Sequence, residues 1–301
     1  MSDVVTAAPP ERLVAVPVRH WGRWLSAVVA IGLFALFVHA LSGADVKWST
    51  TWQFFTFDTI VKGAGRTLLI SVLAQALGIV IGVVVAVMRS SGNPVTAAIG
   101  WLYVWFFRGT PVLLQLLVWF NLAFLFQTLS FPGLGSAQTS DVMTPFVAAL
   151  LGLGINEGAY MAEIVRAGLT SVDEGQTEAA QALGMRRGLL LRRIVLPQAM
   201  RVIVPPTGNE FINMLKTSAL ASIVQYGELL LAAQAIYTNN LQIMELLFAA
   251  ALWYLILTSV FSIGQFYLER RFARGASRNL PPTPLQRLHR SLRSARGEMP
   301  R

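Results

Sequence analysis

Long apolar runs without a charged residue constrain this chain more than any other feature of its sequence. The runs 67–88 and 110–131 contain no Asp, Glu, Lys or Arg. A bilayer core about 30 Å thick is crossed by roughly 20 helical residues, and only helices or closed barrels pair all their backbone groups inside it. The chain as a whole agrees, being 54% hydrophobic and 13% charged. The runs therefore predict membrane-spanning helices.

The same criterion predicts six spans in an all-α membrane domain. The first, 24–41, is either a signal peptide or an uncleaved anchor, and its long polar lead without a small-residue cleavage pattern favours the anchor. The aromatic stretch Trp101–Phe107 is typical of a helix at headgroup level. We expect Thr110 to be the N-cap and Pro111 the first residue of the helix that follows. The predicted spans are 24–41, 67–88, 110–131, 142–165, 210–237 and 245–268.

The basic residues indicate the orientation of the chain. With a cytoplasmic N-terminus, nearly all arginines fall on the cytoplasmic side, in the tail 1–23, around Arg89, in the loop 166–206 and in the tail 269–301. Short cytoplasmic loops carry such an excess, so both termini are predicted to be cytoplasmic. The formal charge of +9 includes the Arg-rich and Pro-rich C-terminal tail. That tail is more typical of an anchor beside anionic lipid than of an arm that binds nucleic acid.

The sequence offers few groups for catalysis or metal binding. It has no cysteine, and its three histidines, His20, His39 and His289, lack the spacing of helical metal ligands. It contains neither a G-x-x-x-x-G-K-[ST] loop nor the G-x-S-x-G and H-E-x-x-H motifs of hydrolases. We therefore expect no catalytic residue, metal or cofactor, and we regard an intramembrane hydrolase as a remote alternative.

The loop 166–206 contains two helical patterns. The first, Gly175–Leu183, is rich in helix-forming residues with acids in its first turn, and Gly184 is placed to end it. The second, Met185–Leu196, is basic on one side and is expected to close at Pro197. The loop is therefore predicted to be structured.

The loop also carries Glu178-Ala179-Ala180, then Gly184 four residues after Ala180, and further on Ile194, Leu196 and Pro197. This spacing resembles the signature in the cytoplasmic loop of binding-protein-dependent ABC permeases. The resemblance covers about residues 62–268. Within the family, this part of the chain resembles the branch that transports polar amino acids such as histidine, glutamine and glutamate. Two features depart from that branch: the span 24–41 is an addition, and Thr217 stands where an acidic or amide residue is common. The signature residues are Glu178, Ala179, Ala180, Leu183, Gly184, Ile194, Leu196 and Pro197, and the branch resemblance rests on Phe106–Pro111, Gly158–Glu163, Arg166, Gly175–Gln176, Leu196–Ala199 and Lys216–Leu220.

The resemblance implies a type I importer permease in the bacterial inner membrane that works by alternating access. It implies a dimer with an identical or related subunit, two ATP-binding cassette ATPases in the cytoplasm and an amino-acid-binding protein outside. The signature residues would contact the ATPase. An ion-coupled carrier or a channel without an ATPase is the alternative, but it would leave the structured loop 166–206 without a purpose.

Polar residues inside the predicted spans are candidates for the substrate path, because such residues are costly in a bilayer and usually face the interior of a bundle. Two faces with helical spacing stand out, one in the fourth span and one in the fifth. Packing is the alternative role for several of them, and lipid anchoring is the simplest one for Arg108. Gly78 and Gly82 are expected to allow close helix approach. The candidates are Asn156, Glu157, Tyr160, Glu163, Glu210, Asn213, Lys216 and Thr217, with Arg108, Gly109, Thr110 and Pro111 as an interfacial motif.

Overall fold

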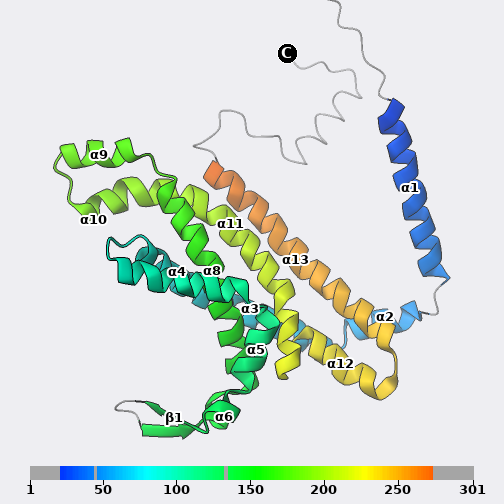
Figure 1. The fold of residues 1–301 in the computed structure, drawn as a ribbon. Helices are drawn as coiled ribbons and strands as arrows, with labels where there is room; N and C mark the ends of the chain where they lie inside the picture. Colours follow the sequence, from blue (N-terminus) through cyan, green and yellow to red (C-terminus); the bar gives the residue numbers. More distant parts are fainter. Residues whose placement is uncertain (1–20, 44–45, 132–134, 274–301) are drawn as a thin grey trace, which may run out of the picture. The chain divides into compact units, whose positions relative to one another are not determined.

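The computed structural model describes residues 21–43, 46–131 and 135–273, and these are mainly helical (Figure 1). The chain divides into two compact units, 1–46 and 47–301. The predicted tails 1–23 and 269–301 lie mostly outside the described residues, as do His20 and His289.

The described part of the first unit forms the helix α1 (Trp21–Ser42). Its large apolar side chains, including Trp24, Phe34 and Phe37, are exposed. An uninterrupted apolar surface of this length suits a helix that faces lipid.

The second unit begins with a short helix, α2 (Trp48–Phe55), and the long helix α3 (Asp58–Arg89). Its other elements are α4 (Pro94–Gly109), α5 (Val112–Phe120), α6 (Leu122–Leu125), β1 (Thr128–Phe131), β2 (Gly135–Gln138), α7 (Thr139–Val142), α8 (Pro145–Thr170), α9 (Glu174–Ala182), α10 (Arg187–Leu190), the π-helix η1 (Leu191–Val195), α11 (Leu196–Thr217), the 3-10 helix η2 (Ser218–Val224), α12 (Leu229–Asn240) and α13 (Ile243–Ala273).

The centre of this unit is the close packing of α3 on α8. A Cβ placed on Gly78 would lie 2.5 Å from Cγ of Glu157, and one on Gly82 would clash with Met161. The close approach predicted from these two glycines is therefore confirmed. Leu116 of α5 and Leu153 of α8 are almost fully buried in the adjoining apolar core.

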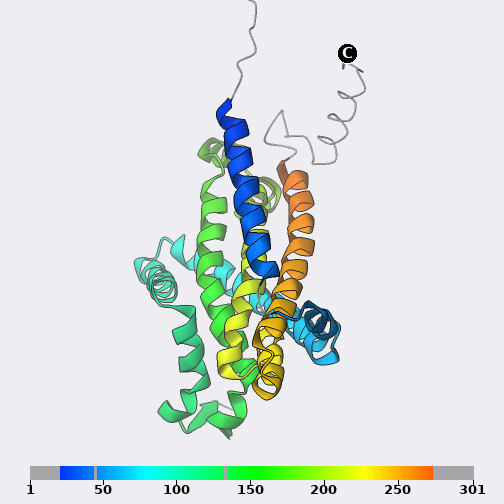
Figure 2. The same cartoon turned by 90° about the vertical axis from the view of Figure 1, so that its right-hand side faces the viewer.

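The α9–α10 segment (171–195) lies at one end of the helical bundle, and the β1–β2 hairpin lies at the opposite end (Figures 1 and 2). The hairpin strands pair antiparallel, with Thr128 opposite Gln138. This hairpin was not predicted, since an apolar helix was expected to continue through 131.

The prediction of one helix over 110–131 is wrong. Thr110 is extended and ends α4, its Oγ donates to the carbonyl of Phe106, and α5 begins at Val112 with Pro111 as its N-cap. The N-cap is therefore shifted by one residue from the predicted Thr110, because Pro111 is itself extended and does not start the helix. The two helices meet at a bend of 100°.

The expected helix over 210–237 is also interrupted. The chain leaves η2 at Gln225, which has a φ of 60°, and α12 begins only at Leu229. Pro197 does not close the preceding helix either, because α11 begins at Leu196 and continues past Pro205 and Pro206. Proline fits the first turn of a helix, and the π-helical turn η1 precedes it without a break.

The break before α12 is held by a fully buried carboxylate, Glu228. It accepts hydrogen bonds from the backbone of Leu230 and Leu231, both at 2.8 Å, and caps α12. Tyr254 of α13 donates to the same carboxylate at 2.6 Å, and Thr67 of α3 donates at 3.5 Å. Glu228 thus joins three helices at the break.

Within the described residues, three helices are long and apolar enough to cross a membrane, and five if each bent pair counts as one span. The three are Trp24–Ser42 of α1, α3 and Ile243–Phe272 of α13; the pairs are α4 with α5 and Arg187–Val224 with α12. The predicted fourth span corresponds to α8, whose polar residues keep it below this criterion. The mainly helical membrane fold predicted from sequence is confirmed, whereas the count of six spans is not established.

Candidate functional site

A polar cavity of about 620 Å³ lies between the α4–α5 bend, α8 and α11. It brings together the two polar faces predicted from sequence and the motif at the bend. The candidates that line it are Arg108, Gly109, Thr110, Pro111, Asn156, Glu157, Tyr160, Glu210, Asn213 and Thr217.

The remaining two candidates lie elsewhere. Lys216 is exposed and does not line the polar cavity. Glu163 lies in a neighbouring hollow of about 370 Å³, where it pairs with Arg89 and with Arg166, the latter at 2.9 Å. Arg89 was not among the predicted site residues, because a single arginine at a helix end carries no signal of its partner.

Arg108 lies between the polar cavity and the neighbouring hollow and lines both. Its guanidinium carbon lies 5.1 Å from the ring centroid of Tyr160, and its Nη1 lies 4.0 Å from Oε1 of Glu163. Cations are attracted to the faces of aromatic rings at such distances. Arg108 therefore contacts protein groups at the cavity, in addition to the lipid headgroup role that its position in the sequence suggests.

The α4–α5 bend is stabilised by side-chain amides. Gln115 is buried, and its Nε2 donates to the carbonyls of Phe107 at 3.0 Å and Thr110 at 3.2 Å. Asn156 of α8 donates to the same Phe107 carbonyl at 2.8 Å. Backbone groups freed by a break inside a membrane need such partners. Asn156 thus has a structural contact besides its place in the cavity wall, and Gln115 was missed by the sequence analysis.

A side chain of α3 donates a hydrogen bond to the carboxylate of Glu157. Glu157 is 5% exposed, and its Oε1 accepts a hydrogen bond of 3.2 Å from Nε2 of Gln75. Gln75 lies in the uncharged run 67–88, whose composition does not indicate which face this glutamine would occupy.

The ionisable groups that line the polar cavity are of both signs. Glu157 and Glu210 bring two carboxyl groups, and Arg108 brings one guanidinium. An anion and a cation separated across a cavity can bind the ammonium and carboxylate groups of one amino acid. No group of three His, Asp or Glu in the described ranges could hold a metal ion.

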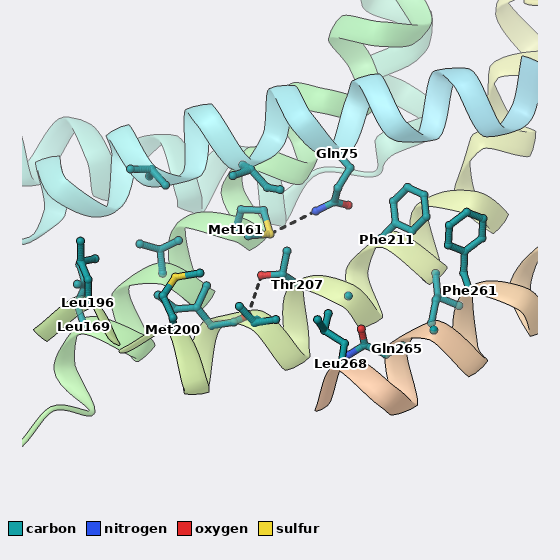
Figure 3. Close-up of a pocket in the computed structure, with 18 residues that line it drawn as sticks. Gln75, Met161, Leu169, Leu196, Met200, Thr207, Phe211, Phe261, Gln265 and Leu268 are labelled. Carbon is teal, nitrogen blue, oxygen red and sulfur yellow. Dashed lines mark hydrogen bonds between the residues drawn. The ribbon is translucent and has the colours of Figure 1, made fainter. Parts of the chain in front are cut away.

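On the other side of Gln75 lies an apolar cavity of about 610 Å³ between α3, α8, α11 and α13 (Figure 3). Figure 3 shows the Gln75 side chain pointing from α3 toward Met161, whose sulfur lies 3.5 Å from Nε2. Phe211, Phe261 and a second buried glutamine, Gln265, also line this cavity. Gln75 therefore stands between an apolar and a polar cavity.

The α9–α10 segment presents the predicted signature residues at the end of the bundle. Gly184 follows α9 with a φ of 74°, and the Met185 amide donates to the carbonyl of Ala180 at 3.1 Å. This is the turn that ends helices at glycine, as predicted from sequence. Glu178 and Ala179 are exposed, and Leu183 is 83% exposed.

The other signature residues lie in α9 and at the junction of η1 with α11. Ala180 is 2% exposed, Ile194 is half-buried in η1, and Leu196 and Pro197 lie exposed at the start of α11. The segment is therefore a folded projection with a small apolar tip at Leu183.

Comparison with known proteins identifies the family of this chain. Residues 78–274 match the family described as binding-protein-dependent transport system inner membrane component. The chain is 43% identical to an arginine transport system permease protein of Corynebacterium glutamicum, over all of this chain and 96% of the relative. It is 35% identical to a glutamine transport system permease protein of Escherichia coli, over 74% of this chain and 96% of the relative.

Solved structures agree with the fold. The structure of an amino acid ABC transporter with histidines matches with a TM-score of 0.65 and 33% identity, over 76% of this chain and 100% of that one. An inward-facing methionine ABC transporter matches with a TM-score of 0.57 over 71% of this chain and 96% of that one. At 19% identity, this second match supports the fold alone. The chain therefore belongs to the inner membrane components of binding-protein-dependent transport systems, among the amino-acid ABC transporter permeases.

Proposed function

We propose that this chain is the permease subunit of an ATP-driven importer that takes up a basic amino acid and works by alternating access. The observation that carries this proposal is the polar cavity, which combines Glu157 and Glu210 with Arg108. The cavity lies among helices that continue into the α9–α10 segment, so that a movement of that segment would reach its walls.

The charges of the cavity favour a cationic substrate. Arg108 can bind the α-carboxylate, and one carboxyl group can bind the α-ammonium. With a neutral amino acid the second carboxylate would have no charged partner, which is costly for a charge that the substrate shields from water. A basic side chain supplies that partner. The relative named as an arginine transport system permease supports the same substrate class.

Energy would enter through a separate ATPase at the α9–α10 segment. The sequence has no phosphate-binding loop of its own. The exposed Glu178 can accept charge-assisted hydrogen bonds, while Ala179 and Leu183 offer a small apolar surface to a groove on the partner. Decisive switching between two conformations needs roughly 5 kcal/mol of differential binding, which nucleotide binding at two partner sites can supply.

In this proposal the α9–α10 segment is cytoplasmic, as are both termini, and the hairpin end faces the amino-acid-binding protein. A second permease subunit, identical or related, would complete the transporter. The signature residues Glu178, Ala179, Ala180, Leu183, Gly184, Ile194, Leu196 and Pro197 would form or support the contact with the ATPase.

The test is binding of radiolabelled arginine and glutamine to the purified permease–ATPase complex without the binding protein. Replacing Glu210→Gln should weaken arginine binding roughly tenfold, because a hydrogen-bonded charge contributes about 1.5–3 kcal/mol, and should affect glutamine much less. Asp141→Asn, at an exposed acid in α7, is the matched control. Equal affinities of wild type and Glu210→Gln for both amino acids would contradict the assignment, as would arginine uptake into vesicles that lack the ATPase.

A further inference from the structure

We propose that Gln75 of α3 is a positioning residue that orients the Glu157 carboxylate toward the polar cavity and so contributes to the preference for cationic substrates. This inference rests on the proposed function, and it assigns a role to a residue outside the predicted substrate path. The two residues come from helices that pack closely at Gly78, so their contact does not depend on a flexible loop.

The first observation is the geometry of the contact. Gln75 Nε2 lies 3.2 Å from Glu157 Oε1, and both residues are 5% exposed. A Cβ on Gly78 would lie 2.8 Å from Cβ of Glu157, so the stem of that glutamate is confined by the α3 backbone. With its stem confined and one oxygen held by an amide, the carboxylate has a restricted set of orientations.

The second observation is that Gln75 is poorly suited to a purely packing role. Its Oε1 is buried and has no hydrogen-bond partner. Toward the apolar cavity, its Nε2 lies 3.5 Å from the sulfur of Met161, which is a weak acceptor. An apolar side chain of similar length would fill this space without leaving an acceptor unpaired. The amide is therefore explained by its bond to Glu157.

The third observation is the position of Gln75 between the two cavities. Gln75 lines the apolar cavity, whereas Glu157 lines the polar one. Without the amide, the carboxylate could turn away from the polar cavity or lose its charge beside apolar neighbours. Either change would remove an anion from the place where a cationic substrate group is bound.

The chain offers a matched control for this role. Gln265 is also buried and lines the same apolar cavity, but its Nε2 donates to the Pro205 carbonyl and to Glu269, not to Glu157. Gln75→Met and Gln265→Met each replace a buried amide by an apolar side chain of similar length. Only Gln75→Met removes the hydrogen bond to Glu157, which lines the polar cavity.

The experiment measures the binding of radiolabelled arginine and glutamine to the purified permease–ATPase complex. Gln75→Met should weaken arginine binding about tenfold and change glutamine binding less than threefold, because a hydrogen bond to a charged group is lost. Gln265→Met should leave the arginine-to-glutamine affinity ratio unchanged. In a Glu157→Gln background, Gln75→Met should cause no further loss of arginine binding, since Gln75 would act through Glu157.

Two results would overturn the inference while leaving the proposed function intact. One is an equal loss of affinity for both amino acids in Gln75→Met and Gln265→Met, which indicates packing. The other is a loss in Gln75→Met that adds fully to that of Glu157→Gln. If the unmodified complex binds neither amino acid, the proposed function fails and this inference fails with it.

Discussion

At the scale of single residues, Glu163 shows how the structure separates residues that the sequence places together. Glu163 and Tyr160 share one face of α8, yet only Tyr160 lines the polar cavity. Glu163 instead joins α3 and α8 through Arg89 and Arg166. Its side chain is 25% exposed and that of Arg89 is 15% exposed, so these charges are screened less than surface pairs.

Replacing Glu163→Gln should therefore destabilise the protein. The change leaves the partly buried Arg89 without its anion, and we expect a loss of about 2 kcal/mol, between the effects of surface and fully buried pairs. The measurement is the thermal unfolding midpoint of the purified protein in detergent.

Asp58→Asn is the control for this prediction. Asp58 pairs with Lys62 at 2.6 Å, but these side chains are 75% and 66% exposed. A pair of that kind adds little stability. If both variants unfold at the wild-type temperature, the Glu163 cluster is not a stabilising contact.

At the scale of elements, the turn after α9 links a local backbone conformation to the proposed coupling. Gly184 has a φ of 74°, and a Cβ at this position would meet no atom within 4 Å. A substitution therefore acts through the backbone and not through a clash, because side chains other than glycine resist the left-handed region by about 1–2 kcal/mol.

Gly184→Asp is expected to abolish the ATP hydrolysis that accompanies transport while the protein remains in the membrane. The strained turn would displace Leu183 and Glu178 from the surface offered to the ATPase. The assay compares ATPase stimulation by the loaded binding protein in wild type and variant. Gly188→Asp, in the neighbouring α10 at a position where a Cβ would meet no atom within 4 Å, should retain stimulation. Normal uptake by Gly184→Asp would refute the coupling role.

The same elements show what could be predicted from sequence. The end of α9 was predicted because a helix and its terminating glycine are local in sequence. The polar faces of α8 and α11 were predicted because helical spacing alone places Asn156 near Tyr160 and Glu210 near Asn213. Such periodicity needs no knowledge of the neighbouring helices.

The breaks in the helices could not be predicted in this way. The α4–α5 bend depends on the amide of Gln115 and on Asn156 of another helix. The break before α12 depends on Glu228 and its partner Tyr254. Each break is stabilised by contacts that form only after distant helices have packed. A hydropathy profile of the sequence does not reveal these contacts.

At the scale of the whole molecule, the second unit has two distinct ends, and the proposed orientation can be tested because the chain contains no cysteine. Leu183, in the α9–α10 segment, is 83% exposed, and Ser136, in the hairpin, is exposed. Each can be replaced by a single cysteine without a background signal.

A membrane-impermeant thiol reagent added to intact cells should label Ser136→Cys and leave Leu183→Cys unlabelled. In inside-out vesicles the pattern should reverse, because the arginine distribution predicts a cytoplasmic position for the α9–α10 segment. Permeabilised cells, in which both sites should react, provide the control. Labelling of Leu183→Cys from outside would overturn the orientation and with it the contact with a cytoplasmic ATPase.

The buried carboxylate of Glu228 has a consequence for biogenesis. Its partners Thr67 and Tyr254 belong to α3 and α13, so the nascent chain cannot complete this cluster until α13 has been synthesised. Until then the chain would carry a carboxylate that lacks its phenol donor, which is an unfavourable state inside a bilayer. Synthesis of α13 would therefore complete the hydrogen bonding of a buried acid that the preceding helices already carry.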